Sequence, residues 1–252
     1  MTRVRALSRT ELRLFLREPV TVLFTLALPL MVLYVLNGVF GQDQAAGDPD
    51  ALVVYRGFPA PDWYTPAYVA MAVAGFALIA LPAHVVEYHE SGVLRRFQAS
   101  GLPKSTVLLS QAVVAMVVAT VGCGLLVAAA LAFTGANPPQ SLWLMVTAFL
   151  VSAAAITAVG LMLGVLLPTA RAAQSVGLLA WFVSLFVSGG GPPPEVLPEG
   201  LRTVGDWWPL TPVIRTLQEP WLTGEWATRD SLVTVAIAVV ALAVAWRAYR
   251  WD

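Results

Sequence analysis

The sequence predicts an all-α integral membrane protein with six transmembrane helices in a single domain over residues 1–252, and three observations lead to that fold class. First, 58% of the 252 residues are hydrophobic and only 12% are charged, which is about half the charged fraction of a soluble domain. Second, the apolar residues are collected into runs that approach or exceed the roughly 20 residues needed to span a bilayer. Third, Lys and Arg are distributed unevenly between the connecting segments. Because lipid leaves no partner for open backbone groups, the apolar runs must be helices.

The expected spans are residues 20–40, 64–86, 106–134, 142–167, 172–190 and 231–249. The first contains no charge, and its 21 residues exceed the apolar core of an ordinary signal peptide. We therefore interpret it as a retained helix rather than a cleaved leader. The apolar part of the last span is short, but Arg247 and Arg250 at its end can extend their charged groups toward the membrane surface.

The basic residues predict the orientation of these helices. With the N-terminus inside and six helices threaded through the membrane, 11 of the 15 Lys and Arg residues lie inside, whereas ten of the 15 Asp and Glu residues lie outside. This distribution satisfies the positive-inside rule and places both termini in the cytoplasm.

Residues 4–18 predict an amphipathic helix that lies on the inner membrane surface and ends at Pro19. A basic stripe recurs every four residues along it, formed by Arg5, Arg9, Arg13 and Arg17. Glu11 and Glu18 are seven residues apart and fall within the opposite, apolar face. Two interpretations stay open: these acids contact protein, for example Arg95 or Arg96, or they extend to water and pair with arginines of their own helix.

The segment between the second and third spans, "VEYHESGVLRRFQASGLPKS", is the most polar stretch in the first half of the chain. Its spacing of Val93, Leu94 and Phe97 predicts a short helix with one apolar side. Gly101 and Pro103 stand where a helix ends. Such a helix is well placed to be gripped by a soluble partner, although an ordinary cytoplasmic loop would account for the same basic residues.

This loop, the "REP" that leads into "VLFTLALPLMVLYVLNGVFG", and "FVSGGGPPPEVLPEGLRTVGDWWPLTPVIRTLQ" before the last span together resemble the ABC-2 family, the membrane subunits of ATP-driven exporters. The resemblance covers essentially the whole chain and is to bacterial permeases of the daunorubicin-exporter type. It implies six helices per subunit, pairing with a second permease copy that is identical or different, and a separate ATP-binding subunit at the cytoplasmic face. ATP and Mg²⁺ would be bound by that subunit, so no cofactor is expected in this chain.

The resemblance also assigns roles to residues. Residues 86–102 correspond to the coupling helix that contacts the ATPase, and residues 4–18 to the elbow helix. The expected coupling residues are Glu87, His89, Glu90, Val93, Leu94, Arg95, Arg96 and Phe97. The expected elbow residues are Arg5, Arg9, Glu11, Arg13, Arg17 and Glu18. The acid-rich E-R-E-x-G-T start of the family's coupling helix occurs here only loosely, as "EYHESGVL", which leaves the docking residues open.

The segment after the fifth span is expected to break its helix, because "GGGPPP" at 189–194 cannot continue one. By resemblance it forms short extracellular helices that dip back into the outer leaflet, with Trp207, Trp208 and Trp221 at an outer gate; a plain extracellular loop is the alternative. The resemblance likewise places a dimer seam and cargo pathway along the first and fifth spans. Its expected aromatic lining is Phe24, Tyr34, Phe182 and Phe186, although aromatics at helical spacing are more often core residues.

Several kinds of chemistry have no sequence signature here. The chain has no P-loop motif, its His84-x-x-Glu87-x-His89 pattern fits no common zinc motif, and no charge stands in the middle of a span. These absences favour a transport subunit over an enzyme, and an ATP-driven partner over an ion-coupled carrier. We expect a multi-pass protein of a bacterial plasma membrane that contacts membrane lipid and no nucleic acid. Its expected activity is export of amphiphilic or drug-like cargo, as in drug efflux and antibiotic resistance. The alternatives are a lipid or glycan exporter of the same family, or a secondary transporter or channel.

Overall fold

The computed structural model describes residues 2–17, 31, 33–35, 38 and 54–249. Within these ranges five helices are long and apolar enough to cross a membrane. They are a continuous helix over Ala60–Glu90, α7 (Lys104–Phe133), α8 (Leu142–Leu166), α9 (Ala170–Val187) and α12 (Thr228–Ala248). The prediction of an all-helical membrane protein is thus confirmed for the described residues, with span boundaries within four residues of those expected. The first predicted span, 20–40, lies largely outside them.

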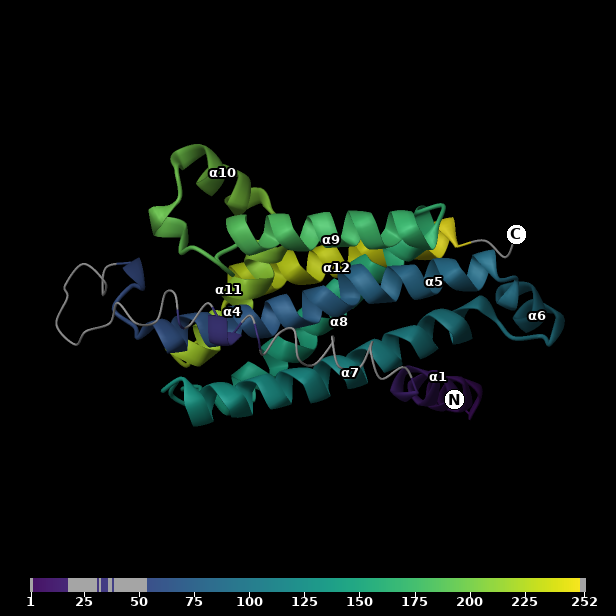
Figure 1. The fold of residues 1–252 in the computed structure, drawn as a ribbon, viewed down its shortest axis with the longest axis horizontal. Coiled ribbons are helices and arrows are strands. Elements are labelled where there is room, and N and C mark those ends of the chain that lie inside the picture. Colours follow the sequence, from purple (N-terminus) through teal and green to yellow (C-terminus); the bar gives the residue numbers. More distant parts are fainter. Residues whose placement is uncertain (1, 18–30, 32, 36–37, 39–53, 250–252) are drawn as a thin grey trace.

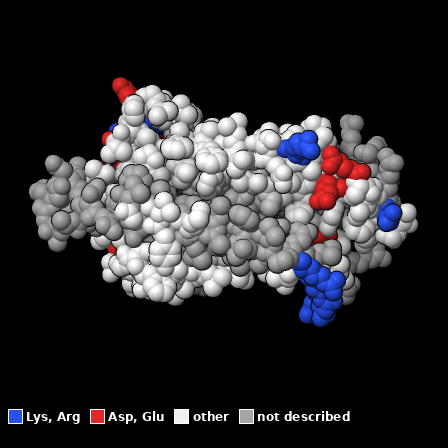
Figure 2. Space-filling view, in the orientation of Figure 1, with Lys and Arg blue, Asp and Glu red and all other residues white. Residues whose placement is uncertain are grey.

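The long helices run side by side between two distinct ends of the bundle (Figure 1). One end carries α1 (Thr2–Leu16), α6 (Val93–Ala99) and the C-terminal end of α12, and we call it the α6 end. The other end carries α10 (Glu199–Trp207) and the short 3₁₀ turn η2 (Pro194–Val196), and we call it the α10 end. The described Lys, Arg, Asp and Glu side chains visible in Figure 2 gather at these two ends and leave an uncharged band between them, as expected of a membrane protein.

The continuous helix Ala60–Glu90 changes its winding halfway along. It consists of α4 (Ala60–Gly75), a π-helical turn η1 (Phe76–Ala80) and α5 (Leu81–Glu90). Pro82 explains the change, because it has no N–H to donate to the carbonyl of Leu78 and its ring crowds that carbonyl. The Leu81 N–H instead bonds the Phe76 carbonyl, five residues back.

Two glycines let neighbouring helices lie directly against this π turn. A Cβ on Gly160 of α8 would lie 1.9 Å from the Ala77 carbonyl oxygen, and one on Gly177 of α9 would lie 1.8 Å from that of Leu78. Gly164, one turn beyond Gly160, faces Val85 of α5 in the same way. The G-x-x-x-G pair of α8 is therefore used for packing within the chain.

Candidate functional site

The predicted coupling helix is divided in the structure rather than continuous. Glu87, His89 and Glu90 belong to the last turns of α5, which ends when the Ser91 N–H and hydroxyl both bond the Glu87 carbonyl, at 2.9 and 2.7 Å. Gly92 then adopts a φ of +69°, and α6 starts at Val93. The expectation of one helix across residues 86–102 was wrong, because a residue without a Cβ is free to take the left-handed conformation that turns the chain.

The second half of this segment forms as expected, as a short helix with one buried side. Leu94 is 2% exposed and joins a core cluster with residues of α5 and α7, and Phe97 packs against the same cluster. Arg96 is exposed on the other side, and the side chain of Arg95 lies outside the described residues. At the end of α6, Gly101 has a φ of +70° and the Leu102 N–H bonds the Phe97 carbonyl at 3.1 Å, which confirms the predicted C-terminal glycine cap.

The N-terminal helix α1 spans Thr2–Leu16, against the predicted 4–18, and packs on the α6 end of α7. Leu7 and Leu12 contact the cluster that contains Leu94, and the Ser8 hydroxyl donates to the Ser110 carbonyl at 3.5 Å. The four arginines of the predicted stripe are all exposed: Arg5, Arg9, Arg13 and Arg17. The helix is thus amphipathic as expected, but its buried side rests on protein rather than only on lipid. Glu18 lies outside the described residues.

Tyr88 of α5 connects α1 to α6. Its hydroxyl donates to the Glu11 carboxylate of α1, and its ring meets the ring of Phe97 of α6 edge to face at 6.4 Å between centroids. Burial raises the pKa of Glu11 above its ordinary value of 4.5, while the hydrogen bond from Tyr88 opposes that rise. Of the two interpretations left open for Glu11 and Glu18, the structure supports contact with protein for Glu11. Its partner is Tyr88, and among the described side chains no ion pair joins it to Arg96.

The two histidines near this junction have structural partners. His84 Nδ1 lies 3.8 Å from Glu87 Oε2, and both side chains are partly exposed. His89 Nδ1 lies 3.2 Å from the Val85 carbonyl oxygen, and its ring meets that of Tyr249, which follows α12. No group of three His, Cys, Asp or Glu side chains that could hold a metal ion occurs within the described ranges.

After α9, the chain folds back into the bundle. α9 ends at Val187, earlier than predicted, and the glycines that follow are buried; a Cβ on Gly190 would lie 2.9 Å from the Met71 side chain. The Trp208 indole then donates to the Ser184 hydroxyl at 2.7 Å. From the level of Ser184, α11 (Leu210–Leu222) runs back toward the α7–α8 connection. It extends over 13 residues, or about 20 Å, and its last carbonyls accept hydrogen bonds from that connection. The segment therefore penetrates about halfway along the bundle.

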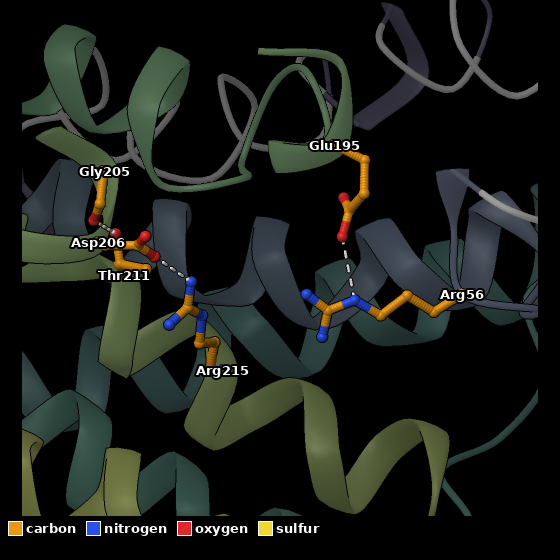
Figure 3. Close-up of polar contacts among 6 residues, drawn as sticks. All are labelled: Arg56, Glu195, Gly205, Asp206, Thr211 and Arg215. Carbon is orange, nitrogen blue, oxygen red and sulfur yellow. Dashed lines mark hydrogen bonds and ion pairs between the residues drawn. The ribbon is translucent and has the colours of Figure 1, made fainter. Parts of the chain in front are cut away.

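Two ion pairs and one hydrogen bond lie in this folded-back segment at the α10 end (Figure 3). Arg215 of α11 pairs with Asp206 of α10 at 2.8 Å, and the Thr211 hydroxyl donates to the Gly205 carbonyl at 2.5 Å. From before α4, Arg56 reaches Glu195 of η2 at 3.0 Å. Two of these three contacts join α10 to α11, and the third joins η2 to the segment before α4.

The three tryptophans expected at an outer gate occupy different environments. Trp207 is 86% exposed on α10, Trp208 is partly buried through its bond to Ser184, and Trp221 is only 2% exposed in the main core cluster. They do not form one aromatic cluster, because successive residues of a helix point in different directions and Trp221 lies on another, buried helix.

The residues expected along a dimer seam lie on the surface of the subunit. Phe182 and Phe186 of α9 are 47% and 55% exposed, and Tyr34 is 46% exposed beside Phe133 of α7. Phe24 lies outside the described residues. None of the three is a core residue. Within this subunit Tyr34 lies beside α7, and the seam with a second copy stays a prediction.

An apolar cavity of about 250 Å³ lies between α8, α9 and the start of α11. Leu78 of the π turn, Ile156, Ala180 and Val213 are among its lining residues, and the Ser184 and Trp208 side chains that bond each other supply its polar edge. This lining suits a hydrocarbon or aromatic group far better than an ion or a sugar.

Sequence reasoning missed polar residues that hold the α10 end of the bundle together. The buried Asp62 accepts from the backbone N–H and the side-chain amide of Asn137, at 2.6 and 2.9 Å. The side chain of Gln218 donates to the Trp63 carbonyl at 3.2 Å. Asp62 in the first turn of α4 and Asn137 before α8 are both visible in the sequence as polar residues beside apolar spans. Nothing in the sequence indicates that they contact each other.

Comparison with known proteins identifies the family. The sequence matches the ABC-2 type transporter family over residues 2–220, and the chain belongs to that family. A search of curated proteins found no significant match. Family membership together with the five apolar helices makes the chain a multi-pass membrane protein and a permease subunit of an ABC transporter, a transport subunit rather than an enzyme.

Proposed function

We propose that this chain is the permease subunit of an ATP-driven exporter that moves amphiphilic or drug-like cargo out of the cytoplasm. A separate ATP-binding subunit docks on α6 and hydrolyses ATP with Mg²⁺. Its closure displaces α6 and rocks two permease subunits between inward-open and outward-open states, and cargo leaves beneath the folded-back α10–α11 segment.

The observation that carries this proposal is the position of Tyr88. It lies between Phe97 of α6 and Glu11 of α1, and it stands on the helix that runs the length of the bundle. A displacement of α6 is therefore transmitted to α1 and to the core around Leu94 through direct side-chain contacts. The exposed Arg96 gives an ATPase an accessible contact on the same short helix.

The proposed orientation puts the α6 end in the cytoplasm and the α10 end outside. It follows from the predicted excess of Lys and Arg on the inner side. In this arrangement residues 20–40 form a sixth span, both termini are cytoplasmic, and the protein resides in a bacterial plasma membrane.

The nature of the cargo and of the dimer is proposed from the apolar surfaces. The cavity near Ser184 and the exposed aromatic face of α9 favour amphiphilic cargo and a seam formed with a second permease copy. Lipid export fits the same lining and is the alternative; a glycan would need polar groups that this cavity lacks.

Copurification tests the docking surface. We expect a nucleotide-binding subunit to copurify with the tagged chain from native membranes and Arg96→Glu to weaken its retention. Arg202→Glu, which reverses an exposed arginine of α10 at the opposite end, is the matched control and should have no effect. Equal retention in both variants would remove α6 as the contact.

Cysteine cross-linking tests the seam. Cys123 is buried and can be replaced, after which Phe186→Cys provides a probe on α9 and Val239→Cys, at 59% exposure, a matched probe on α12. A homodimer along α9 predicts a cross-linked product for the first variant only. A product for the second variant alone would move the seam to α12.

A further inference from the structure

A groove of about 370 Å³ runs between α1 and the α6 end of α7. Its apolar floor consists of Leu12 of α1 and Val113, Val114 and Val117 of α7. Arg5 and Arg9 line the same groove, one turn apart on α1. The groove therefore places two cations beside a hydrocarbon surface.

Neither arginine is neutralised within the described part of the chain. Both are exposed, and neither takes part in an ion pair with a described acid. The nearest acid along the helix, Glu11, is engaged by Tyr88 on the buried side. Guanidinium groups prefer phosphate or carboxylate oxygens, which they bind with two hydrogen bonds at once.

The apolar floor continues away from the arginines along α7. A second groove of about 430 Å³ shares Val113 and Val117 with the first and extends to Val121. These three valines are 43%, 39% and 53% exposed and recur every four residues, so they form one stripe on the helix. From Val113 to Val121 the stripe rises about 12 Å, close to the roughly 15 Å of one leaflet's hydrocarbon.

We propose that this groove binds one anionic phospholipid. Its phosphate lies between Arg5 and Arg9, and one acyl chain lies along Val113, Val117 and Val121. The order of charge and hydrocarbon in the groove matches that of such a lipid. The helix α1 lies at the α6 end of the bundle (Figure 1), where charged side chains meet the uncharged band (Figure 2). A lipid bound there joins α1 to α7 and so supports the helix that carries Glu11.

The test uses the purified full-length chain in mild detergent, titrated with phosphatidylglycerol or with zwitterionic phosphatidylcholine, with bound lipid counted by native mass spectrometry. Wild type should retain about one phosphatidylglycerol per subunit and bind phosphatidylcholine more weakly. The double variant Arg5→Gln/Arg9→Gln should bind phosphatidylglycerol about tenfold or more weakly, since each basic residue near a lipid surface contributes about fivefold.

The matched control is Arg13→Gln/Arg17→Gln, which removes the same charge from the same helix but outside the groove. It should leave the affinity within about twofold. If both double variants lose affinity equally, attraction is a property of the whole stripe and the proposal is overturned. Val117→Trp, which fills the groove and keeps both arginines, should also displace the lipid; undiminished binding would overturn the proposed path of the acyl chain. An unchanged melting temperature in each variant verifies folding. If the groove is instead covered by a second copy, Val117→Trp will dissociate dimers in lipid-free detergent, which would also overturn the proposal.

Discussion

The α10 end of the bundle is braced by hydrogen bonds between separate elements, whereas the α6 end is joined mainly by apolar packing. At the α10 end, Asp62 bonds Asn137 twice, Gln218 bonds the Trp63 carbonyl, and the N–H groups of Gln140 and Ser141 bond the last turn of α11. At the α6 end the inter-element hydrogen bonds include the long Ser8–Ser110 contact and Glu11–Tyr88.

This difference separates a rigid end from one that can respond to a partner. Hydrogen bonds are directional and are lost after small shifts, whereas apolar contacts tolerate sliding. In the proposed transport cycle the elements that must move, α1 and α6, are those with few directional links. The elements that support the folded-back α11 are those with many.

Substitutions in the packing around the π turn, midway between the two ends, should destabilise the protein most. Gly177→Leu would put a side chain into the Leu78 carbonyl and the Ile79 backbone, both within a rigid π turn. We expect a loss of more than about 4 kcal/mol in the free energy of unfolding, measured as failure to recover a monodisperse protein. Gly124→Leu, with open space around its Cβ position, is the control and should yield normal protein.

Breaking the brace at the α10 end should have the next largest effect. Asp62→Ala removes both bonds to Asn137 and leaves its donors unpaired, for a loss of about 3 kcal/mol. Thermal unfolding in detergent should show a lower midpoint, while Glu225→Ala, an exposed acid at the same end, should not. Equal midpoints for the two variants would contradict the idea of a braced end.

At the α6 end the expected effect is smaller and depends on pH. Because burial raises the pKa of Glu11, folding favours its protonated form, and stability is lost as the pH rises from 4.5 through the raised value. Glu11→Gln keeps an acceptor for Tyr88 but cannot ionise, so it should remove this pH dependence and stabilise the protein at neutral pH. Melting curves of both proteins between pH 4.5 and 7.5 provide the measurement; parallel curves would rule out the buried carboxylate as their cause.

The smallest effect is expected from the ion pair between Arg215 and Asp206. Their side chains are 35% and 52% exposed, and solvent screens such pairs. Arg215→Ala should change the free energy of unfolding by less than about 1 kcal/mol, as measured by denaturant titration. A larger loss would show that α10 is held by this pair rather than by the buried bonds of Trp208 and Thr211.

The sequence was sufficient for the features that depend on local pattern. Uninterrupted apolar runs predicted the five described spans, and the four-residue arginine spacing predicted α1. Features that depend on two distant positions could not be predicted. The bond between Glu11 and Tyr88 joins residues 77 apart and that between Asp62 and Asn137 joins residues 75 apart. The break at Gly92 was missed because a glycine inside a helical segment can either continue the helix or, as here with a φ of +69°, turn the chain.

The π turn at Phe76–Ala80 also sets the helical phase of everything beyond it. Each residue of an α-helix turns the chain by about 100°. If this turn rewound as an ordinary α-helix with all of its residues kept, α5 would rotate by about that amount relative to α4. Tyr88 would then leave Glu11, and Val85 would leave Gly164, while Asp62 and Trp63 kept their partners. The extra residue is thus a phase shift that lets one continuous helix present independent faces to the two ends of the bundle.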